Sequence, residues 1–409
     1  MRKIYDAVHG FIRFNELERE LIDSAPFQRL HYLHQLGIAY LVYPGATHTR
    51  FEHSLGVMEL ATRIFDRITS KSSYAAKEEL AYWRQIIRLA ALSHDLGHLP
   101  FSHVAEKILL GKQGHEKWTL EILQSGVFDA VFEKLQAAFP QKEVAIDVIK
   151  MAIGEEKLST LTDYPWEFTP WERVMCQIIT GDFFGADRID YLLRDAQCTG
   201  VSYGLFDYHQ MIEMLCILPV EGENTLELGI EENGIESCEA LLLARHFMYK
   251  RVYQYSSVKA YSFHLARFME ALALSKKIEL GTLDAFLALT ENEILTELRR
   301  AERDPDAPGH RDALALSDRK KRFKALELTD QVNEGTLWAL KKELEIPDEA
   351  IAWEVSHDKK RPFGLSFSVL TSRKKILPAS RCSDILIHLG SAGWAYVDPL
   401  IEEKVRQSI

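Results

Sequence analysis

The sequence predicts a mainly α-helical protein with a smaller C-terminal lobe of mixed α and β structure. Apolar residues recur at three- and four-residue steps through most of residues 15–300, as on the buried face of a helix. Only 22 Gly and 13 Pro occur in 409 residues, which leaves little room for a disordered or fibrous chain. Beyond residue 300, short strand-like runs such as residues 365–370 take over. We therefore expect a multi-helical core followed by an α+β lobe.

Three segments of the core carry a clear helical stripe. In residues 50–68 and 186–196, apolar residues fall on one face of a helix. Residues 87–94 do the same, and Gly97 and Pro100 are expected to end that helix. A fourth segment, residues 235–276, contains neither Gly nor Pro, which predicts one or two long helices.

Two segments depart from this pattern. Residues 217–230 include an alternating run at 226–230 after a glycine-containing turn, which predicts a short β-hairpin. Residues 299–318 are rich in charge, and their Pro and Gly residues predict a loop or linker. We place a domain boundary there, between a helical core of residues 1–300 and a lobe of residues 301–409 that would serve regulation or oligomerisation.

Composition and charge exclude several classes of protein. The formal net charge of −11 argues against a protein that coats nucleic acid or an anionic membrane. No run approaches the length of a membrane-spanning helix, and the N-terminus lacks an apolar signal region. The five cysteines are widely spaced and form no Cys-x-x-Cys pair, which indicates reduced thiols. We therefore expect a cytoplasmic protein that binds neither membranes nor nucleic acid.

Histidine is concentrated near the N-terminus, where nine of the fifteen fall in the first 115 residues. Three polar segments, residues 48–56, 94–103 and 187–195, are rich in His or Asp and together look like one site dispersed in the sequence. A single His–Asp pair is weak evidence, since residues 357–358 repeat it in a stretch that we expect on the surface. Buried imidazoles and carboxylates are costly unless they are paired or bound to metal, so the combination favours a functional site.

The residue types of these segments suit a metal centre for phosphoryl chemistry. Two imidazoles and two carboxylates would offer nitrogen and oxygen ligands to Fe, Mn, Zn or Ni, with positions left for water and substrate. Because no thiolate is among them, a closed structural zinc site is not expected. Arg50 lies three residues before His53, so it can point at the same substrate and bind a phosphate.

Further residues near these segments offer proton transfer and sugar binding. His98 and His103 are candidate general acids, because histidine titrates near neutral pH. Glu106 lies three residues after His103 and could orient its ring. Tyr191 and Asp195 lie four residues apart on one helix face, where they could meet a sugar.

These motifs resemble those of the HD-domain metal-dependent phosphohydrolases. They look most like the deoxynucleoside triphosphate (dNTP) triphosphohydrolase branch, which includes bacterial enzymes and the vertebrate sterile-alpha-motif HD-domain enzyme. The resemblance covers roughly residues 3–275, from residues 6–10 and 27–30 through the three segments to residues 245–254. It implies a helical HD-domain catalytic core, a divalent transition metal, with Mg as a further candidate, and a homo-oligomer, either dimer or tetramer. The implied reaction is hydrolysis of a dNTP to deoxynucleoside and inorganic triphosphate, by attack of a metal-activated hydroxide on the α-phosphate.

The resemblance also implies roles by position in this sequence. The metal ligands would be His53, His94, Asp95 and Asp187. The residues that act on the α-phosphate would be Arg50, His98, His103 and His115, with His103 as the acid for the 5′-oxygen. The sugar would be bound by Gln35, Tyr191 and Asp195. The triphosphate and sugar would be approached from a long helix by Arg245, Lys250 and Tyr253.

A site for an activating nucleotide is where the resemblance is weaker. Asp23 and Gln28 fit the family pattern, but His31 stands where an Arg is usual, and Tyr5 where the vertebrate enzyme has an Asn. A basic run at residues 319–324 resembles a segment that helps to bind the activator, but it could equally be a solvated strand edge. The candidate regulatory residues are Asp23, Gln28, Lys320 and Lys324.

Two other functions stay open on the sequence. The protein could be an HD phosphohydrolase for another nucleotide or phosphate ester, which release of intact triphosphate would exclude. It could also be a nucleotide sensor that has lost catalysis. The complete ligand set and both candidate acids, His98 and His103, argue against a degenerate site.

Overall fold

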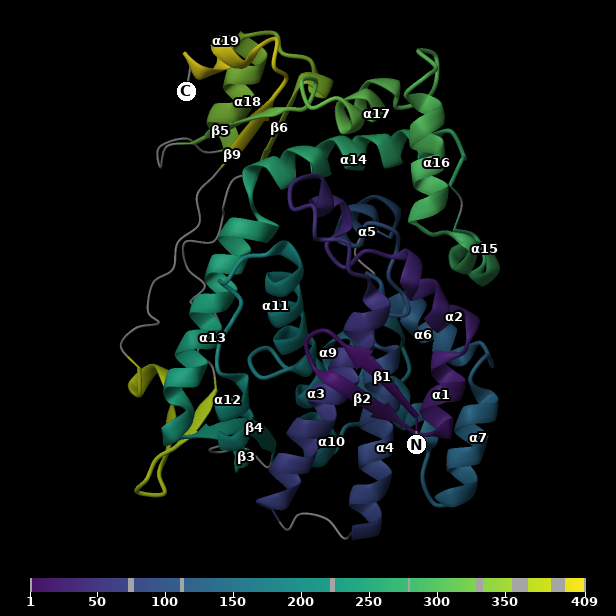
Figure 1. Cartoon of the computed structure of the whole chain (residues 1–409), viewed down its shortest axis with the longest axis vertical. Helices are drawn as coiled ribbons and strands as arrows, with labels where there is room; N and C mark the ends of the chain where they lie inside the picture. Colours follow the sequence, from purple (N-terminus) through teal and green to yellow (C-terminus); the bar gives the residue numbers. More distant parts are fainter. Residues whose placement is uncertain are drawn as a thin grey trace.

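The computed structural model describes residues 2–72, 77–110, 114–220, 225–278, 280–328, 334–354, 367–383 and 394–407, with all their side chains except those of residues 77, 103, 107 and 354. Helices make up most of the fold, which confirms the mainly α class (Figure 1). A small lobe that contains both helices and strands lies at one end of the molecule. It is formed by the C-terminal part of the chain, as the composition predicts.

The helices follow one another through most of the chain. The first are α1 (Glu16–Ile22), α2 (Ala25–Gln28), α3 (Arg50–Ser70), α4 (Lys77–Ser93), α5 (His103–Leu109) and α6 (Glu116–Gln124). Next come α7 (Asp129–Ala138), α8 (Val144–Ile153), α9 (Glu155–Leu161), α10 (Pro170–Thr180), α11 (Ala186–Thr199) and α12 (Tyr208–Met214). The last are α13 (Ile235–Met248), α14 (Ser256–Leu274), α15 (Leu283–Ala288), α16 (Glu291–Ala301), α17 (His310–Ser317), α18 (Glu334–Glu343) and α19 (Glu402–Arg406).

Helix α3 is the central helix of the core and packs against both α4 and α11. Its first turn is stabilised by Glu52, whose carboxylate accepts a 2.8 Å hydrogen bond from the backbone N–H of Thr49. Gly56 is required where α3 meets α11, because a Cβ there would lie 1.9 Å from Oδ1 of Asp190. The missing side chain therefore lets the two helices that carry the polar segments approach each other closely.

Helix α4 ends at Ser93, four residues before the glycine that is predicted to end it. The carbonyl of Ala91 accepts a 2.8 Å hydrogen bond from Nδ1 of His94, in place of the next helical backbone bond. The chain then continues in turns through Asp95 and His98. As a result, His94 and Asp95 project from a turn rather than from a helix.

The strands of the described residues form three small sheets. β1 (Arg2–Asp6) and β2 (Gly10–Phe14) form an antiparallel hairpin. β3 (Leu215–Pro219) and β4 (Leu226–Glu231) form the predicted hairpin, and β7 (Ser368–Leu370) and β8 (Ile376–Pro378) extend it in the order β3-β4-β7-β8. The lobe contains β5 (Lys324–Glu327), β9 (Trp394–Val397) and β6 (Ile351–Glu354), in that order.

The structure adds detail to three of the predicted elements. Residues 235–276 form two helices, α13 and α14, separated by a π-helical turn at Tyr249–Tyr253. The Pro- and Gly-containing part of residues 299–318 is a loop, as predicted, and it joins the end of α16 at Ala301 to α17 at His310–Ser317. The strand predicted at residues 365–370 corresponds to β7, which pairs with β4 of the core, while residues 365–366 lie outside the described part. The boundary at residue 300 stays a prediction.

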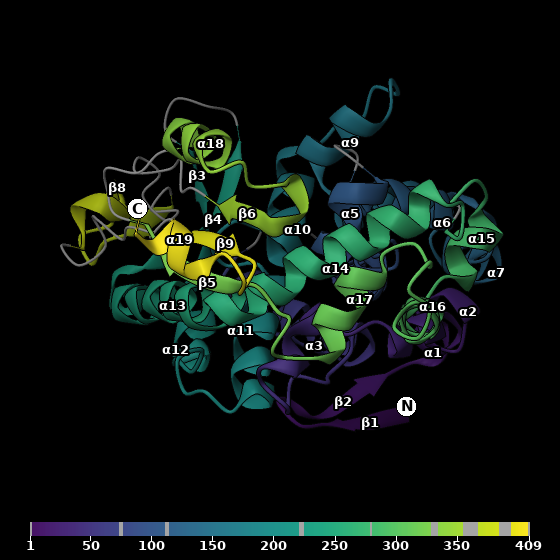
Figure 2. The same cartoon turned by 90° about the horizontal axis from the view of Figure 1, so that it is seen from above.

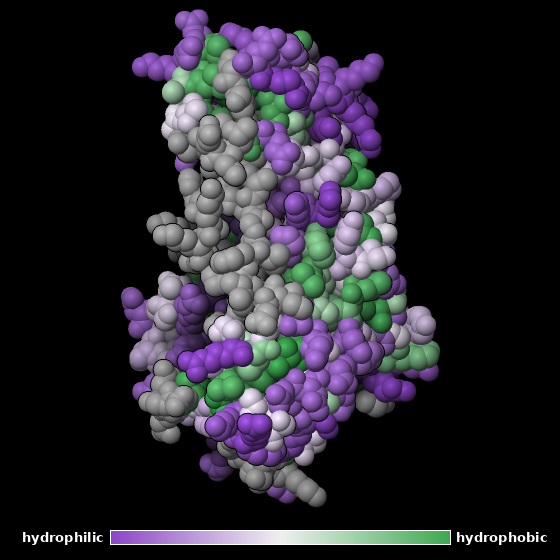
Figure 3. Space-filling model, turned by 90° about the vertical axis from the view of Figure 1, so that its left-hand side faces the viewer, coloured by the Kyte–Doolittle hydropathy of each residue, from purple (hydrophilic) through white to green (hydrophobic). Residues whose placement is uncertain are grey.

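Helix α14 runs between the lobe and the core, with α17 beside it (Figures 1 and 2). The lobe packs on α14 through Phe323 and Tyr396, which form one buried cluster with Ala260. Most of the coloured residues on the face in Figure 3 are hydrophilic, and the apolar ones lie in patches. Among the residues that the structure describes, no helix is long and apolar enough to cross a bilayer.

Candidate metal centre

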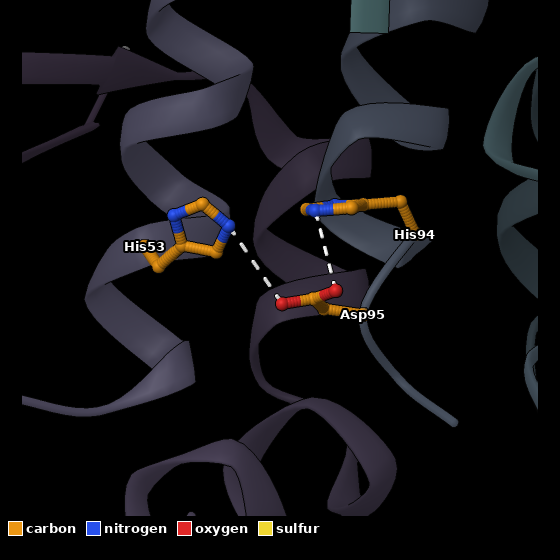
Figure 4. A group of neighbouring side chains, drawn as sticks. All are labelled: His53, His94 and Asp95. Carbon is orange, nitrogen blue, oxygen red and sulfur yellow. Dashed lines mark ion pairs between the residues drawn. The ribbon is translucent and has the colours of Figure 1, made fainter. Parts of the chain in front are cut away.

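His53, His94 and Asp95 converge from two different parts of the core. Figure 4 shows both imidazole rings pointing at the Asp95 carboxylate, with His53 on α3 and His94 on the turn after α4. The Asp95 oxygens lie 3.7 Å from Nε2 of His53 and 3.4 Å from Nε2 of His94. Asp187, near the start of α11, completes the group, with Oδ1 3.0 Å from His53 Nε2 and 3.8 Å from His94 Nε2. The structure thus brings together the four predicted ligands.

The two histidines have the hydrogen bonds expected of metal ligands. Nδ1 of His94 donates to the Ala91 carbonyl, so Nε2 carries the lone pair that faces the site. This Nε2 is buried and has no hydrogen-bond partner among the described residues. Nδ1 of His53 lies 2.8 Å from Oδ2 of Asp190, so its Nε2 is likewise directed at the site. A carboxylate or carbonyl behind each ring fixes the tautomer that a metal needs.

The charges of the group also favour a bound cation. Burial lowers the pKa of His53, but hydrogen bonds to Asp187 and Asp190 outweigh burial and raise the pKa to about 10. Burial raises the pKa of Asp95, but the charges of Arg50 and His94 hold it well below its ordinary value. The buried carboxylates therefore keep negative charge beside the imidazoles, which favours a proton or a cation at this position. A divalent metal would balance the same negative charge, so these residues fit one.

Arg50 lies against Asp95 and is held there by Ser102. Its Nη1 pairs with Oδ2 of Asp95, and its Nε and Nη2 donate to Oγ of Ser102 at 3.1 and 2.6 Å. Ser102 and the preceding Phe101 both have positive φ, 51° and 60°, which costs about 1–3 kcal/mol for each such residue. A strained turn between the two candidate acids therefore supplies the hydroxyl that orients Arg50.

His98, His115 and Glu106 lie on the other side of Asp95. Nε2 of His98 is 3.1 Å from Oδ1 of Asp95, and its Nδ1 is 2.6 Å from Oε1 of Glu106. The ring of His115 stacks on that of His98, with centroids 3.6 Å apart, and its Nδ1 is 3.5 Å from the same Glu106 oxygen. Burial and the charge of His98 lower the pKa of His115.

Asp95, His98 and His115 also lie close enough together to be considered as a second group of metal ligands. Their geometry does not favour it, because an imidazole binds metal in the plane of its ring, and two rings stacked at 21° cannot share such a position. The pair is better suited to proton transfer. Glu106, predicted to orient His103, bonds His98. The side chain of His103 lies outside the described part, so its role as acid stays a prediction.

Two pockets meet beside the metal-ligand group. One has a volume of about 850 Å³ and is lined by His94, Asp95, His98, His115 and Asp187. The other has a volume of about 620 Å³ and is lined by Ser102, Asp195, Arg245 and Tyr253. Both pockets are also lined by Gln35, Arg50 and Tyr191. A molecule bound in the smaller pocket would therefore pass these three side chains to reach the predicted metal-binding residues.

Asp195 in the smaller pocket is oriented by two side chains. Its Oδ1 lies 2.7 Å from Nε2 of His48, and its Oδ2 accepts a 2.8 Å hydrogen bond from the hydroxyl of Tyr253. Burial lowers the pKa of His48, but the hydrogen bond to Asp195 outweighs it and raises the pKa to about 9. Tyr253 is the last residue of the π-helical turn, a feature that is frequent at functional sites. Lys250, which was predicted to approach the triphosphate, lies on the same turn but is exposed and lines neither pocket.

The four candidate regulatory residues lie in two separate places. Asp23 is exposed at the end of α1, and Gln28 donates a 2.8 Å hydrogen bond to the carbonyl of Ile22. Lys320 is exposed before β5, and Lys324 begins that strand. Among the described residues no hydrogen bond or ion pair joins the two pairs, so a shared site within one chain stays a prediction.

Sequence reasoning missed three residues that support the site, namely His48, Ser102 and Asp190. Each acts on a predicted residue, since His48 bonds Asp195, Ser102 bonds Arg50 and Asp190 bonds His53. The sequence marked these residues only by their position within the three polar segments. Their partners are distant in the chain, however, so no spacing rule could assign them.

Comparisons with known proteins identify the family of this chain. The HD domain matches residues 50–143, and the HD associated region matches residues 206–361. A hypothetical protein from Aquifex aeolicus has a similar structure, with a TM-score of 0.79 and 31% identity over 100% of this chain and 99% of that one. The chain therefore belongs to the HD-domain family and carries the HD-associated region.

Curated relatives are similar over part of their length. An uncharacterized protein of Methanocaldococcus jannaschii is 34% identical over 313 residues, 73% of this chain and 58% of that protein. The deoxynucleoside triphosphate triphosphohydrolase SAMHD1 of Bos taurus is 31% identical over 274 residues, 62% of this chain and 45% of that protein. The chain spans between 50% and 58% of the length of the first four such relatives.

Proposed function

We propose that the protein is a metal-dependent phosphohydrolase that cleaves dNTPs into deoxynucleoside and inorganic triphosphate. One observation carries the proposal, which is the convergence of His53, His94, Asp95 and Asp187 beside a pocket lined by two arginines and a carboxylate. The similarity to a protein named as a deoxynucleoside triphosphate triphosphohydrolase supports the choice of substrate. Nitrogen and oxygen ligands without a thiolate suit Fe, Mn, Zn or Ni, with Mg as a further candidate.

The smaller pocket offers separate groups for the phosphates and the sugar. Arg50 and Arg245 are the cations that would bind phosphoryl oxygens, as guanidinium groups do in bidentate fashion. Asp195 would repel a phosphate but can accept a hydrogen bond from a sugar hydroxyl, which Tyr253 and His48 would help to align. Tyr191 and Gln35 line both pockets and would contact the sugar between these ends.

A bound divalent metal would supply Lewis-acid polarisation of a phosphoryl oxygen and an activated water. The protein's own residues would then stabilise charge on either side of the α-phosphate. Arg50, fixed by Ser102, would offset charge on the phosphoryl oxygens. His98 and His115 would hold a proton near the α-phosphate with Glu106 behind them, and His103 is our proposed donor to the 5′-oxygen.

The oligomeric state, the cytoplasmic location and the activating nucleotide belong to the same proposal. A homo-oligomer would be required for an activator site that combines Asp23 and Gln28 with Lys320 and Lys324, because no contact joins the two pairs within one chain's described residues. Light scattering on the purified protein measures the oligomer directly.

Product analysis on the purified, Mn-supplemented protein tests the reaction. Each dNTP is supplied alone and in mixtures, and nucleosides and polyphosphates are separated by ion exchange. We expect deoxynucleoside and intact triphosphate, and turnover only in mixtures would indicate an activator site. Release of orthophosphate or pyrophosphate would contradict the proposed cleavage. Bound metal without turnover of any dNTP would instead favour another phosphate ester or a sensing role.

A further inference from the structure

Asp190 lies behind the proposed metal site and is fully buried between two histidines. Its Oδ2 is 2.8 Å from Nδ1 of the proposed ligand His53, and its Oδ1 is 2.6 Å from Nε2 of His9. His9 comes from the turn of the N-terminal β-hairpin, 181 residues away in the chain. The two imidazoles are therefore joined by one carboxylate.

Arg194 ties the same carboxylate to the hairpin by a second route. Its Nε and Nη2 donate to the two oxygens of Asp190 at 2.8 and 3.0 Å, and its Nη1 donates to Oδ2 of Asp6 at 2.7 Å. Oδ1 of Asp6 accepts the backbone N–H groups of Val8 and His9, at 2.9 and 2.8 Å, and so shapes the hairpin turn. The hairpin is thus bonded both to Asp190 and to the residue that neutralises it.

Every side chain that takes part is shielded from water. Asp190 and Arg194 are 0% and 1% exposed, and Asp6 and His9 are 6% and 8% exposed. Gly56 lets Asp190 and Arg194 lie directly against α3, because any Cβ there would clash with both. Buried polar groups of this kind are retained only when their hydrogen bonds are satisfied, so loss of one donor should disturb the others.

We propose that His9 is a positioning residue for the metal ligand His53, acting through Asp190, so that docking of the N-terminal hairpin sets the affinity of the metal site. Oδ2 of Asp190 holds the His53 ring in the tautomer that directs Nε2 at the metal, and His9 helps Arg194 to hold the carboxylate in place through Oδ1. The inference rests on the proposed metal site but not on the identity of the substrate.

Two substitutions of His9 separate hydrogen bonding from packing. In His9→Gln the side-chain amide nitrogen stands near the position of Nε2 and can still donate to Asp190. His9→Leu fills similar space without a donor. Ile12→Val is the matched control, because Ile12 is a fully buried residue of the same hairpin that does not bond Asp190, so its change loosens packing alone.

The measurement is Co²⁺ binding to the metal-free protein, by competition with a chromophoric chelator and by the visible spectrum of the bound ion. We expect His9→Leu to weaken Co²⁺ binding by about 10- to 100-fold and to change the spectrum, as other changes behind a ligating His do. His9→Gln and Ile12→Val should bind Co²⁺ nearly as the unaltered protein does. The spectrum reports the ligand geometry, which a loss of packing alone would not change.

The inference is wrong if His9→Leu binds Co²⁺ as tightly as the unaltered protein and with the same spectrum. It is also wrong if Ile12→Val weakens binding as much as His9→Leu, because the effect would then be one of hairpin packing. Failure of the unaltered protein to bind Co²⁺ would overturn the metal site and this inference together. Tight binding without cleavage of any dNTP would overturn only the proposed reaction.

Discussion

The two sides of Asp95 are built in different ways. On one side, His53 and Asp187 come from α3 and α11, and the Asp190 carboxylate lies behind the His53 imidazole. On the other side, His98 lies on the chain between α4 and α5, a connection that includes two residues with positive φ. The helical side fits a metal that must be held in one geometry. The turn side, with stacked rings that share Glu106, fits groups that must exchange protons.

Asp95 belongs to both sides, so its removal should have the largest effect. We expect Asp95→Ala to lose bound metal and to lower dNTP turnover by at least about 1,000-fold, with the fold retained. Metal analysis and circular dichroism accompany the assay. His94→Ala should behave alike, since it removes a ligand from the same group. Near-normal turnover in metal-replete Asp95→Ala protein would disprove the site.

The helical side of this comparison was largely predictable from the sequence, and the turn side was not. The spacing of apolar residues placed His53 on the inner face of a helix, and the same periodicity placed Asp187, Tyr191 and Asp195 on α11. Periodicity says nothing about a turn, so the early end of α4 and the positive φ of Ser102 had no sequence signal.

Long-range partners also escaped prediction, for a related reason. His9 and Asp190 are 181 residues apart, and β7 pairs with β4 across more than 130 residues. Such contacts depend on how whole elements pack, which local propensity and spacing do not determine. The resemblance to a known family supplied the ligand set, because its motifs already combine segments that fold together.

Glu106→Gln tests whether the turn side acts in catalysis rather than in metal binding. The amide keeps the shape of the side chain but removes the charge beside His98, so we expect kcat to fall about 100-fold while metal content stays the same. Steady-state kinetics and metal analysis on one preparation measure both. Glu116→Gln is the matched control, because this carboxylate is 3.8 Å from His115 and pairs mainly with Lys157. Equal losses in both variants, or loss of metal in Glu106→Gln, would contradict the division of roles.

Asp195→Ala tests the sugar end of the smaller pocket. Asp195 is held by His48 and Tyr253 and is not among the grouped ligand residues, so its loss should weaken binding rather than chemistry. We expect KM to rise about 10-fold, equivalent to about 1.4 kcal/mol, with a smaller change in kcat. A fall in kcat with unchanged KM would instead assign Asp195 to the reacting groups.

Substitutions of Ser102 are expected to have the smallest of these effects, and they test backbone strain on the turn side most directly. Ser102→Ala and Ser102→Gly both remove the hydroxyl that accepts from Nε and Nη2 of Arg50, so both should lose activity to the same extent. They differ in backbone cost, because only glycine adopts φ 51° and ψ −124° without strain. We therefore expect the glycine variant to be more stable than the alanine variant by about 1 kcal/mol, measured by urea unfolding. Equal stability would show that the turn is not strained, and recovery of activity in Ser102→Gly alone would show that backbone conformation, rather than the hydroxyl, positions Arg50.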